Sequence, residues 1–358
     1  NTIIREYDIR GVYDGTLFDK DAEILGNLFG LEVGKNKHVN VGYDGRLSSI
    51  NLKERLIKGL VDSGVNVNEI GLVPTPLLYY SCFELVANGG IIVTGSHNPK
   101  EHNGFKIVLN NKPFFGENLL ELTQKAGKFY FKKMNGSVKK ISLMNKYIKR
   151  LVKNFDQKKK INIIWDSGNG AAGEVMNALA KKIDGKYELL LSWIDGSFPN
   201  HHPDPGNPEN LKDLSDKVLS EKANIGLAFD GDGDRLGVVD NKGKIIPQDK
   251  FLMLLAKDIL KNSPQAKIIF DVKCTNRLKD VILTYGGEPI MSPTGHFHIK
   301  KMLRKTNAHL AGEMSGHIFF NDDWYGFDDA HYSLSLIHIS EPTRPERISY
   351  GVLCVKKK

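Results

Sequence analysis

At residues 89–106 the sequence reads Gly89-Gly-Ile-Ile-Val-Thr-Gly-Ser-His-Asn-Pro-Lys-Glu-His-Asn-Gly-Phe-Lys106. The apolar run Gly89–Val93 is typical of a buried strand, and the hydroxyl of Ser96 follows it on a loop with a turn-forming Asn-Pro pair. Ligand crevices of open α/β sheets lie at the carboxyl ends of strands. A hydroxyl between His97 and Lys106 is therefore well placed to carry or receive an anionic group, with phosphate as the natural candidate. The alternative is a polar loop whose side chains only satisfy backbone groups.

Strand and helix patterns alternate around this loop. Val39–Asp44 alternates as a strand, and Ser49–Leu60 has the apolar spacing of a helix. We expect Val61–Val73 to form the next strand and Pro74-Thr-Pro76 to be the turn that ends it. This alternation indicates βαβ units with a mostly parallel sheet, and 358 residues suggest two to three α/β domains.

The composition excludes several classes of protein. Hydrophobic residues make up 41% and charged residues 26% of the chain, as in ordinary globular proteins. No apolar run approaches the roughly 18 residues of a membrane-spanning helix. The net charge of +8 comes without a nucleic-acid motif, and the three cysteines lack metal-ligand spacing. We therefore expect a cytoplasmic protein with neither a membrane nor a nucleic-acid partner.

A second polar loop, Asp230-Gly-Asp-Gly-Asp-Arg235, lies between two apolar strand patterns. Its carboxylates would repel one another without a cation, and the glycines let the backbone curl so that they can converge. Oxygen ligands favour Mg²⁺ over Zn²⁺. An EF-hand is excluded because Arg235 and Asn241 stand where glycine and glutamate are needed. A solvated acidic turn is the alternative, and the predicted metal ligands are Asp230, Asp232 and Asp234.

Two more polar loops, Thr294-Gly-His296 and Gly312-Glu-Met-Ser-Gly-His317, follow predicted strands. In an extended conformation, the alternate residues Glu313, Ser315 and His317 would point to one side. An acceptor, a donor and a titratable imidazole in one row would suit adjacent sugar hydroxyls. The chemistry of this row alone is only suggestive of sugar binding.

Two other segments receive no catalytic role. The glycine-rich turn Ser167–Gly173 follows the predicted strand Ile161–Asp166 and opens a helix, which tight packing explains as well as phosphate binding does. Phe198–Pro208 contains four prolines, so it cannot be regular structure. We interpret His201 and His202 as loop residues because no third metal ligand is near them in the sequence.

Together these motifs resemble those of the α-D-phosphohexomutases, in particular the bacterial phosphomannomutase/phosphoglucomutase branch, from Ile4 to about Leu334. The resemblance implies three tandem α/β domains with mixed, mostly parallel sheets around a central cleft. We expect a phosphoserine-loop domain at 1–141, a metal-binding-loop domain at 142–244 and a sugar-recognition-loop domain at 245–334.

The end of the chain does not follow the family. Residues 335–350 resemble the translation of a sequencing-library adapter, so we interpret 335–358 as an artefactual tail. The family's fourth, C-terminal domain would then be missing. On that interpretation the activity of the truncated chain is expected to be impaired.

The resemblance also implies a reaction. A phosphate on Ser96 passes to the free hydroxyl of a hexose 1- or 6-phosphate, of mannose or glucose, and the bound 1,6-bisphosphate reorients and returns its other phosphate. The cofactors implied are Mg²⁺, with the Ser96 phosphate oxygen as a further ligand, and glucose 1,6-bisphosphate as the phosphorylating activator. We expect a monomer. The implied catalytic residues are Ser96, Lys106, His317, Arg10, His97 and Arg235, and the implied sugar-binding residues are Lys273, His296, Glu313 and Ser315.

Two other functions stay open at this point. Water could intercept the phosphoserine, which would make the protein a Ser96-dependent sugar-phosphate phosphatase. A non-catalytic phosphosugar-binding protein is disfavoured, because Ser96 and all three aspartates of the acidic loop are present.

Overall fold

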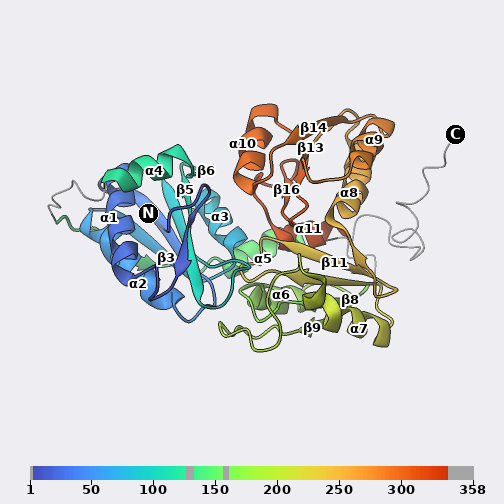
Figure 1. Cartoon of the computed structure of the whole chain (residues 1–358), viewed down its shortest axis with the longest axis horizontal. Helices are drawn as coiled ribbons and strands as arrows, with labels where there is room; N and C mark the ends of the chain where they lie inside the picture. Colours follow the sequence, from blue (N-terminus) through green and yellow to red (C-terminus); the bar gives the residue numbers. More distant parts are fainter. Residues whose placement is uncertain (1–2, 126–132, 156–160, 338–358) are drawn as a thin grey trace. The chain divides into compact units, whose positions relative to one another are not determined.

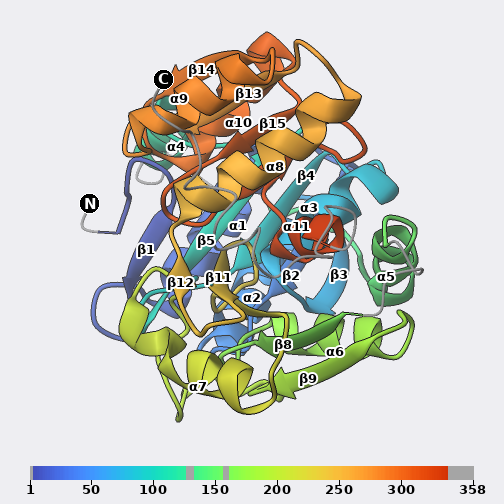
Figure 2. The ribbon, with the colours of Figure 1, turned by 90° about the vertical axis from the view of Figure 1, so that its right-hand side faces the viewer.

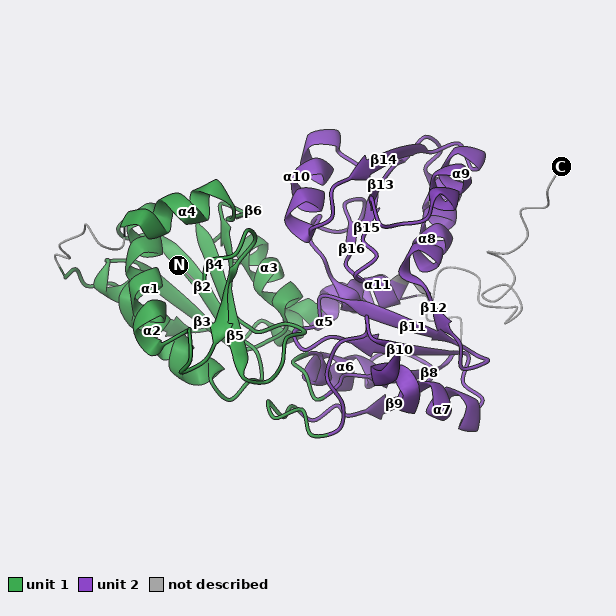
Figure 3. Ribbon diagram, in the orientation of Figure 1, with its two compact units in different colours: residues 1–147, 169–171, 194–199 green, residues 148–168, 172–193, 200–358 purple. Residues whose placement is uncertain are grey.

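The structure is a computed structural model that describes residues 3–125, 133–155 and 161–337 (Figure 1). The chain divides into two compact units (Figure 3). Unit 1 comprises residues 1–147, 169–171 and 194–199, and unit 2 comprises residues 148–168, 172–193 and 200–358. Within the described residues, no helix is both long and apolar enough to cross a membrane. The predicted tail 335–358 lies almost entirely outside these residues, so its interpretation stays a prediction.

Unit 1 is built on a seven-stranded sheet of order β1-β5-β4-β2-β3-β7, with β6 paired to β5. Strands β4, β2, β3 and β7 run parallel, and β1 and β5 add antiparallel pairs at one edge. The strands are β1 (Ile9–Val12), β2 (His38–Tyr43), β3 (Asn66–Leu72), β4 (Gly89–Val93), β5 (His102–Leu109), β6 (Lys112–Pro113) and β7 (Val138–Lys140).

Buried apolar side chains of this sheet and of its helices form one core. The helices α1 and α2 cross closely because each helix places a glycine against the backbone of the other. A Cβ on Gly26 would lie 2.2 Å from the Leu56 carbonyl oxygen, and one on Gly59 would lie 2.2 Å from that of Glu23. The helices of this part are α1 (Asp19–Val33), α2 (Ser49–Asp62), α3 (Thr75–Glu84) and α4 (Glu117–Gln124), and the boundary between the units falls within α5 (Met144–Val152).

Two expectations for this region are wrong. The strand predicted at Val61–Val73 begins only at Asn66, because the apolar spacing of α2 continues to Asp62. The predicted Pro74-Thr-Pro76 turn is instead the start of α3. A proline is tolerated in the first turn of a helix, where its missing N–H would have had no partner in the helix.

Unit 2 contains two sheets. The first has the order β12-β11-β10-β8-β9, with β9, β8 and β10 parallel and β11 and β12 antiparallel. Its strands are β8 (Asn162–Asp166), β9 (Lys186–Leu190), β10 (Ile225–Phe229), β11 (Leu236–Asp240) and β12 (Ile245–Ile246), and its helical segments are α6 (Ala172–Ala180), η2 (Pro208–Leu211) and α7 (Lys212–Ser220).

The second sheet has the order β14-β13-β15-β16, with only β16 antiparallel. Helices α8 and α9 cover one face of it and α10 covers the other (Figures 1 and 2). All three sheets mix parallel and antiparallel pairs between helices, which agrees with the predicted α/β class. The elements are α8 (Gln248–Asn262), β13 (Lys267–Asp271), α9 (Asn276–Thr284), β14 (Glu288–Ser292), α10 (His296–Thr306), β15 (Leu310–Gly312), β16 (Ile318–Phe320) and α11 (Ala330–Ile337).

Candidate active site

Ser96 lies in unit 1 on the loop that follows β4, as the strand pattern predicted. The residue is 2% exposed. Its φ of 49° lies in the left-handed region that residues other than glycine rarely adopt. Its N–H donates to Oγ1 of Thr94 at 2.8 Å, and its Oγ lies 3.4 Å from Nδ1 of His97. A backbone of this kind persists only where the surroundings hold it firmly.

Arg46, which the sequence analysis missed, provides much of that hold. Its side chain is fully buried. A planar guanidinium with five donors suits several acceptors at once. The only sequence signal was its place directly after a predicted strand. Arg46 donates to four carbonyl oxygens of the loop, those of Ser96 (2.7 Å), Asn98 (2.6 Å), Pro99 (2.6 Å) and His102 (3.0 Å).

Asp44, at the end of the predicted strand Val39–Asp44, binds the same loop. We call Asp44 and Arg46 together the frame of the Ser96 loop. Its Oδ2 accepts from Thr94 Oγ1 at 2.8 Å and from the Gly95 N–H at 3.1 Å, and lies 3.3 Å from Nε of Arg46. Its Oδ1 accepts from the Arg46 N–H at 3.0 Å and from Ser49 Oγ at 2.6 Å. Asp44 and Arg46 therefore form a buried ion pair at the end of β2, and the hydrogen bonds of both residues hold the Ser96 loop there.

The frame explains why residue 95 is a glycine. A Cβ on Gly95 would lie 2.4 Å from Cζ and Nε of Arg46 and 2.7 Å from the His102 carbonyl oxygen. We predict that Gly95→Ala lowers the free energy of unfolding by about 1–3 kcal/mol, the usual cost of overpacking. Urea unfolding checks this, with Gly206→Ala as the control, because only the flexible Asp204 side chain lies near that glycine. Equal losses in the two variants would contradict the frame.

Lys106 and Arg10 lie on the same sheet as the Ser96 loop. Lys106 is buried on β5, opposite Ile92 of β4. Arg10 lies on β1, opposite Gly104 of β5, and its Nη2 is 2.5 Å from Oδ2 of Asp8. The structure therefore gathers Ser96, His97, Lys106 and Arg10 on neighbouring strands and loops of unit 1.

The acidic loop connects β10 to β11 in unit 2. Asp230, Asp232 and Asp234 are all fully buried, and one carboxylate oxygen from each lies within 4.8 Å of the others. Oδ1 of Asp230 accepts from the backbone N–H groups of Asp234 and Arg235, both at 3.1 Å. Three buried carboxylates at this separation form an oxygen-only donor set that suits a hard divalent cation.

His201 lies in the irregular proline-containing segment that the sequence predicted. Its Nε2 is 2.9 Å from Oδ2 of Asp166, and Nδ1 is 3.0 Å from the His202 carbonyl oxygen. Burial lowers the pKa of His201, but the Asp166 carboxylate outweighs it, so that the pKa is raised overall. The Pro203 carbonyl accepts from Gly231 N–H at 3.2 Å, so this segment supports the acidic loop.

This pair predicts a pH-dependent contribution to stability. Because folding raises the pKa of His201, its contribution is fully present below the unfolded value of about 6.5 and is lost as the pH rises through the folded value. We expect the difference in free energy of unfolding between the wild type and His201→Gln to shrink from pH 6 to pH 8. Urea unfolding across that range measures it, and a constant difference would contradict the ion pair.

The predicted sugar-binding loops meet at the end of β13. Asp271 Oδ2 accepts from Thr294 Oγ1 at 3.1 Å, and its Oδ1 accepts from the Met314 N–H at 3.4 Å. Glu313 Oε1 accepts from the Gly295 N–H at 2.5 Å, and Oε2 accepts from Ser315 Oγ at 3.5 Å. Burial raises the pKa of the Glu313 carboxyl.

The expected extended row of Glu313, Ser315 and His317 is wrong. The Gly316 N–H donates to the Glu313 carbonyl at 3.1 Å, and the Glu313 N–H donates to the His317 carbonyl at 3.0 Å, so the segment is a closed turn. Gly316 has a φ of 97°, which favours glycine. Lys273 is exposed on the turn after β13.

His296 and His317 stack on each other. Their rings are 4.8 Å apart and inclined by 6°. His296 is the first residue of α10 and not the loop residue expected. Nε2 of His317 accepts from Arg235 Nε at 3.1 Å, and its Nδ1 lies 3.5 Å from Oδ1 of Asp234. The predicted residues Asp234, Arg235, His296 and His317 therefore form one cluster in unit 2.

The sequence analysis also missed Asp328, which is fully buried beside both imidazoles. Ligand atoms of His296, His317 and Asp328 lie within 4.8 Å of one another, so they too could surround a metal ion. However, Nζ of Lys300 lies 2.6 Å from Oδ1 of Asp328. A second cation is disfavoured there because the lysine already balances the carboxylate.

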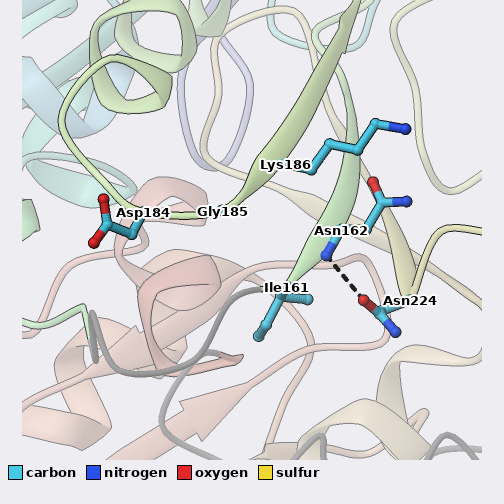
Figure 4. Close-up of a pocket in the computed structure, with 6 residues that line it drawn as sticks. All are labelled: Ile161, Asn162, Asp184, Gly185, Lys186 and Asn224. Atoms are coloured by element: carbon cyan, nitrogen blue, oxygen red, sulfur yellow. Dashed lines mark hydrogen bonds between the residues drawn. The ribbon is translucent and has the colours of Figure 1, made fainter.

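Figure 4 shows a pocket at the other end of the first sheet of unit 2. It has a volume of about 480 Å³ and lies where β8, β9 and β10 begin, whereas the acidic loop follows the end of β10. The Asn162 N–H donates to Asn224 Oδ1 there at 2.8 Å. No cluster of predicted site residues lines this pocket, which is bordered by Ile161, Asn162, Asp184, Gly185, Lys186 and Asn224.

Comparison with known proteins agrees with these motifs. Residues 1–129, 145–243 and 247–343 match the models of phosphoglucomutase/phosphomannomutase alpha/beta/alpha domains I, II and III. The chain belongs to this family. A phosphomannomutase/phosphoglucomutase of Pseudomonas syringae is 46% identical over 351 residues, which cover 97% of this chain and 76% of the relative.

Other phosphoglucomutase/phosphomannomutase family members are similarly close. A Neisseria gonorrhoeae phosphoglucomutase is 44% identical over 336 residues, covering 92% of this chain and 73% of the relative. A solved family structure from Burkholderia thailandensis has a TM-score of 0.93 at 41% identity, covering 98% of this chain and 79% of that one. The predicted family and the predicted α/β class of three tandem domains are confirmed. The boundaries at 141, 244 and 334 stay predictions.

Proposed function

We propose that this protein is a phosphohexomutase that interconverts hexose 1-phosphate and hexose 6-phosphate, with mannose and glucose as the candidate hexoses. The observation that carries the proposal is the buried Ser96 loop, whose backbone is held by Asp44 and Arg46 at the end of β4. Such a loop presents one hydroxyl in a fixed place, which a phosphoryl carrier requires. Family membership supports an enzyme of this class over a binding protein.

In the proposed reaction the bond between Ser96 Oγ and phosphorus breaks as the phosphoryl group bonds to the free hydroxyl of the sugar. The proton of that hydroxyl passes to a nearby base, and Ser96 Oγ takes up a proton. The resulting 1,6-bisphosphate reorients and returns its other phosphoryl group to Ser96. Glucose 1,6-bisphosphate is the proposed source of the first phosphate. The residues proposed for proton transfer and charge stabilisation are Lys106, His317, Arg10, His97 and Arg235, and those proposed to hold the sugar are Lys273, His296, Glu313 and Ser315.

The buried carboxylates of Asp230, Asp232 and Asp234 are the proposed Mg²⁺ ligands, with a phosphate oxygen on Ser96 as a further ligand. Their separation and burial support a divalent cation. When bound, the ion neutralises charge on the transferring phosphoryl group. Asp230 also fixes the loop itself, because it accepts the backbone N–H groups of Asp234 and Arg235.

A reducing, cytoplasmic location and a monomeric state complete the proposal. Cys82 and Cys274 are buried free thiols. Burial raises the pKa of Cys82 to about 12, so this thiol is protonated at neutral pH. We further propose that the domain boundaries lie at 141, 244 and 334, as the sequence predicts.

A coupled assay tests the function. Glucose 1-phosphate or mannose 1-phosphate is supplied with Mg²⁺ and a trace of glucose 1,6-bisphosphate, and the 6-phosphate and inorganic phosphate are measured together. The proposal predicts isomerised product in large excess over released phosphate. Phosphate release without isomerisation would indicate a phosphatase, and neither product would contradict both activities.

The metal assignment makes its own prediction. Asp232→Asn removes one negative charge from the proposed ligand set, so we expect Mg²⁺ affinity and phosphoryl transfer to fall together, by about 10- to 100-fold. Isothermal titration with Mg²⁺ and the coupled assay measure the two. Asp213→Asn, on α7, is the control. Full transfer after treatment with EDTA would contradict the assignment.

A further inference from the structure

A short segment that follows β9 packs against the frame of the Ser96 loop. Residues 194–199 lie in the stretch that matches the model of domain II, yet they belong to the compact unit 1 (Figure 3). A Cβ on Gly45 would lie 2.2 Å from Cγ2 of Ile194, and one on Gly196 would lie 2.3 Å from the Gly45 carbonyl oxygen. The glycines at these two positions therefore allow the segment to lie directly on the chain beside Arg46.

The segment places an aromatic ring over the buried arginine of the frame. Cζ of Arg46 lies over the Phe198 ring, 5.1 Å from the ring centroid. A cation within about 6 Å of a ring centroid is attracted by the negative charge of the ring face. The hydrogen bonds of Arg46 to the loop run from Nη1 and Nη2, in the plane of the guanidinium. A ring over the face of the group therefore does not compete with them.

The Phe198 ring is held in place by a turn of its own. Phe198 has a φ of 48°, in the left-handed region that residues other than glycine rarely adopt. Its N–H donates to the Asp195 carbonyl oxygen at 3.0 Å. Oδ1 of Asp195 accepts from the N–H and the Oγ of Ser197, at 2.9 Å and 2.7 Å. Backbone of this kind persists only where its surroundings hold it firmly, so the turn presents the ring in a fixed place.

We infer that Phe198 is a positioning residue of the Ser96 loop and acts through Arg46. Its ring covers the guanidinium, keeps water from the face of that group and so strengthens the hydrogen bonds that fix the loop backbone. These bonds hold Ser96 at its φ of 49°. The inference rests on the proposed function, in which Ser96 Oγ must stand in one place for phosphoryl transfer.

Hydrogen exchange tests the inference without any substrate. Phe198→Leu keeps an apolar side chain but removes the ring, so the amides of residues 94–102 should exchange about 5- to 30-fold faster, the range expected for loss of a desolvated cation–π contact. Mass spectrometry of peptides measures this, with the amides of α4 as the internal reference. Phe198→Tyr retains a ring and should keep the slow exchange. The matched control is Phe18→Leu, which removes an exposed ring of the same unit and should leave the loop unchanged.

The coupled assay gives the functional readout. Phe198→Leu should lower kcat by about 5- to 30-fold and leave KM for the hexose phosphate within about twofold, because a loosened loop affects the transfer step and not the binding of the sugar. Phe198→Tyr and Phe18→Leu should both keep the activity of the wild type. A merely structural role of Phe198 would not predict this division between kcat and KM or the rescue by tyrosine.

Three results would overturn the inference. They are loop exchange in Phe198→Leu within about twofold of the wild type, equally fast exchange in the leucine and tyrosine variants, and faster exchange that extends equally to α4. An inactive wild type that shows the expected exchange pattern would overturn only the proposed function.

Discussion

Ser96→Ala is expected to abolish phosphoryl transfer, lowering kcat in the coupled assay by at least about 10⁴-fold. The substitution removes the proposed carrier, and the neighbouring hydroxyl cannot replace it. Thr94 Oγ1 donates to Asp44 at 2.8 Å and accepts from the Ser96 N–H, so both of its roles are structural. The loop should keep its shape, because Arg46 binds the Ser96 carbonyl and not its side chain.

The matched control is Ser137→Ala, which removes an exposed hydroxyl of unit 1 that donates to Asn66 Oδ1. Wild-type activity is expected in this variant. If Ser96→Ala kept more than a tenth of the wild-type activity, another residue would have to carry the phosphate.

Arg46→Met is expected to have the second largest effect. It leaves four loop carbonyls without their donor and the buried Asp44 carboxylate without its counter-ion. Breaking a buried pair in this way costs about 3–5 kcal/mol, and a loop displaced by about 1 Å costs about 10²-fold in rate. We therefore expect a lower melting temperature together with a loss of transfer.

Two further variants separate charge from geometry at this position. Arg46→Lys keeps the charge but loses the planar fork, so it should recover stability only in part. Asp44→Asn combined with Arg46→Met should cost less than the sum of the single changes, because the double variant leaves no uncompensated charge. Additive losses in calorimetry would show that the two residues do not act as one frame.

The parts of the site that the sequence predicted are those with local patterns. Ser96 follows an apolar run that is β4, and the acidic loop lies between the two runs that are β10 and β11. In each case the strand and the glycines next to the motif lie within a few residues. The chemistry and the secondary structure could therefore be inferred from the same short window.

The missed residues act over long sequence separations. Arg46 binds Ser96, which is 50 residues away. Asp328 faces Lys300 and both histidines from elements that the fold brings together. Neither belongs to a periodic pattern, so only the packed structure reveals its partners.

The wrong expectations have a local cause. The expected strand began too early because Val61 was assigned to it, whereas α2 continues to Asp62 and Ser63-Gly64 separates this helix from β3. The expected row of side chains at Glu313–His317 required an extended backbone. Gly316, with a φ of 97°, instead turns the chain back on itself. Turn residues override the alternation of side chains that an extended strand would impose.

The phosphoserine is tested most directly by intact-mass spectrometry of the protein incubated with glucose 1,6-bisphosphate and Mg²⁺, followed by peptide mapping. One added phosphoryl group is predicted, located on the peptide that contains Ser96 and discharged to sugar bisphosphate when glucose 6-phosphate is added. Folded protein whose mass stays unchanged, or a phosphoryl group on any residue other than Ser96, would contradict the proposed mechanism.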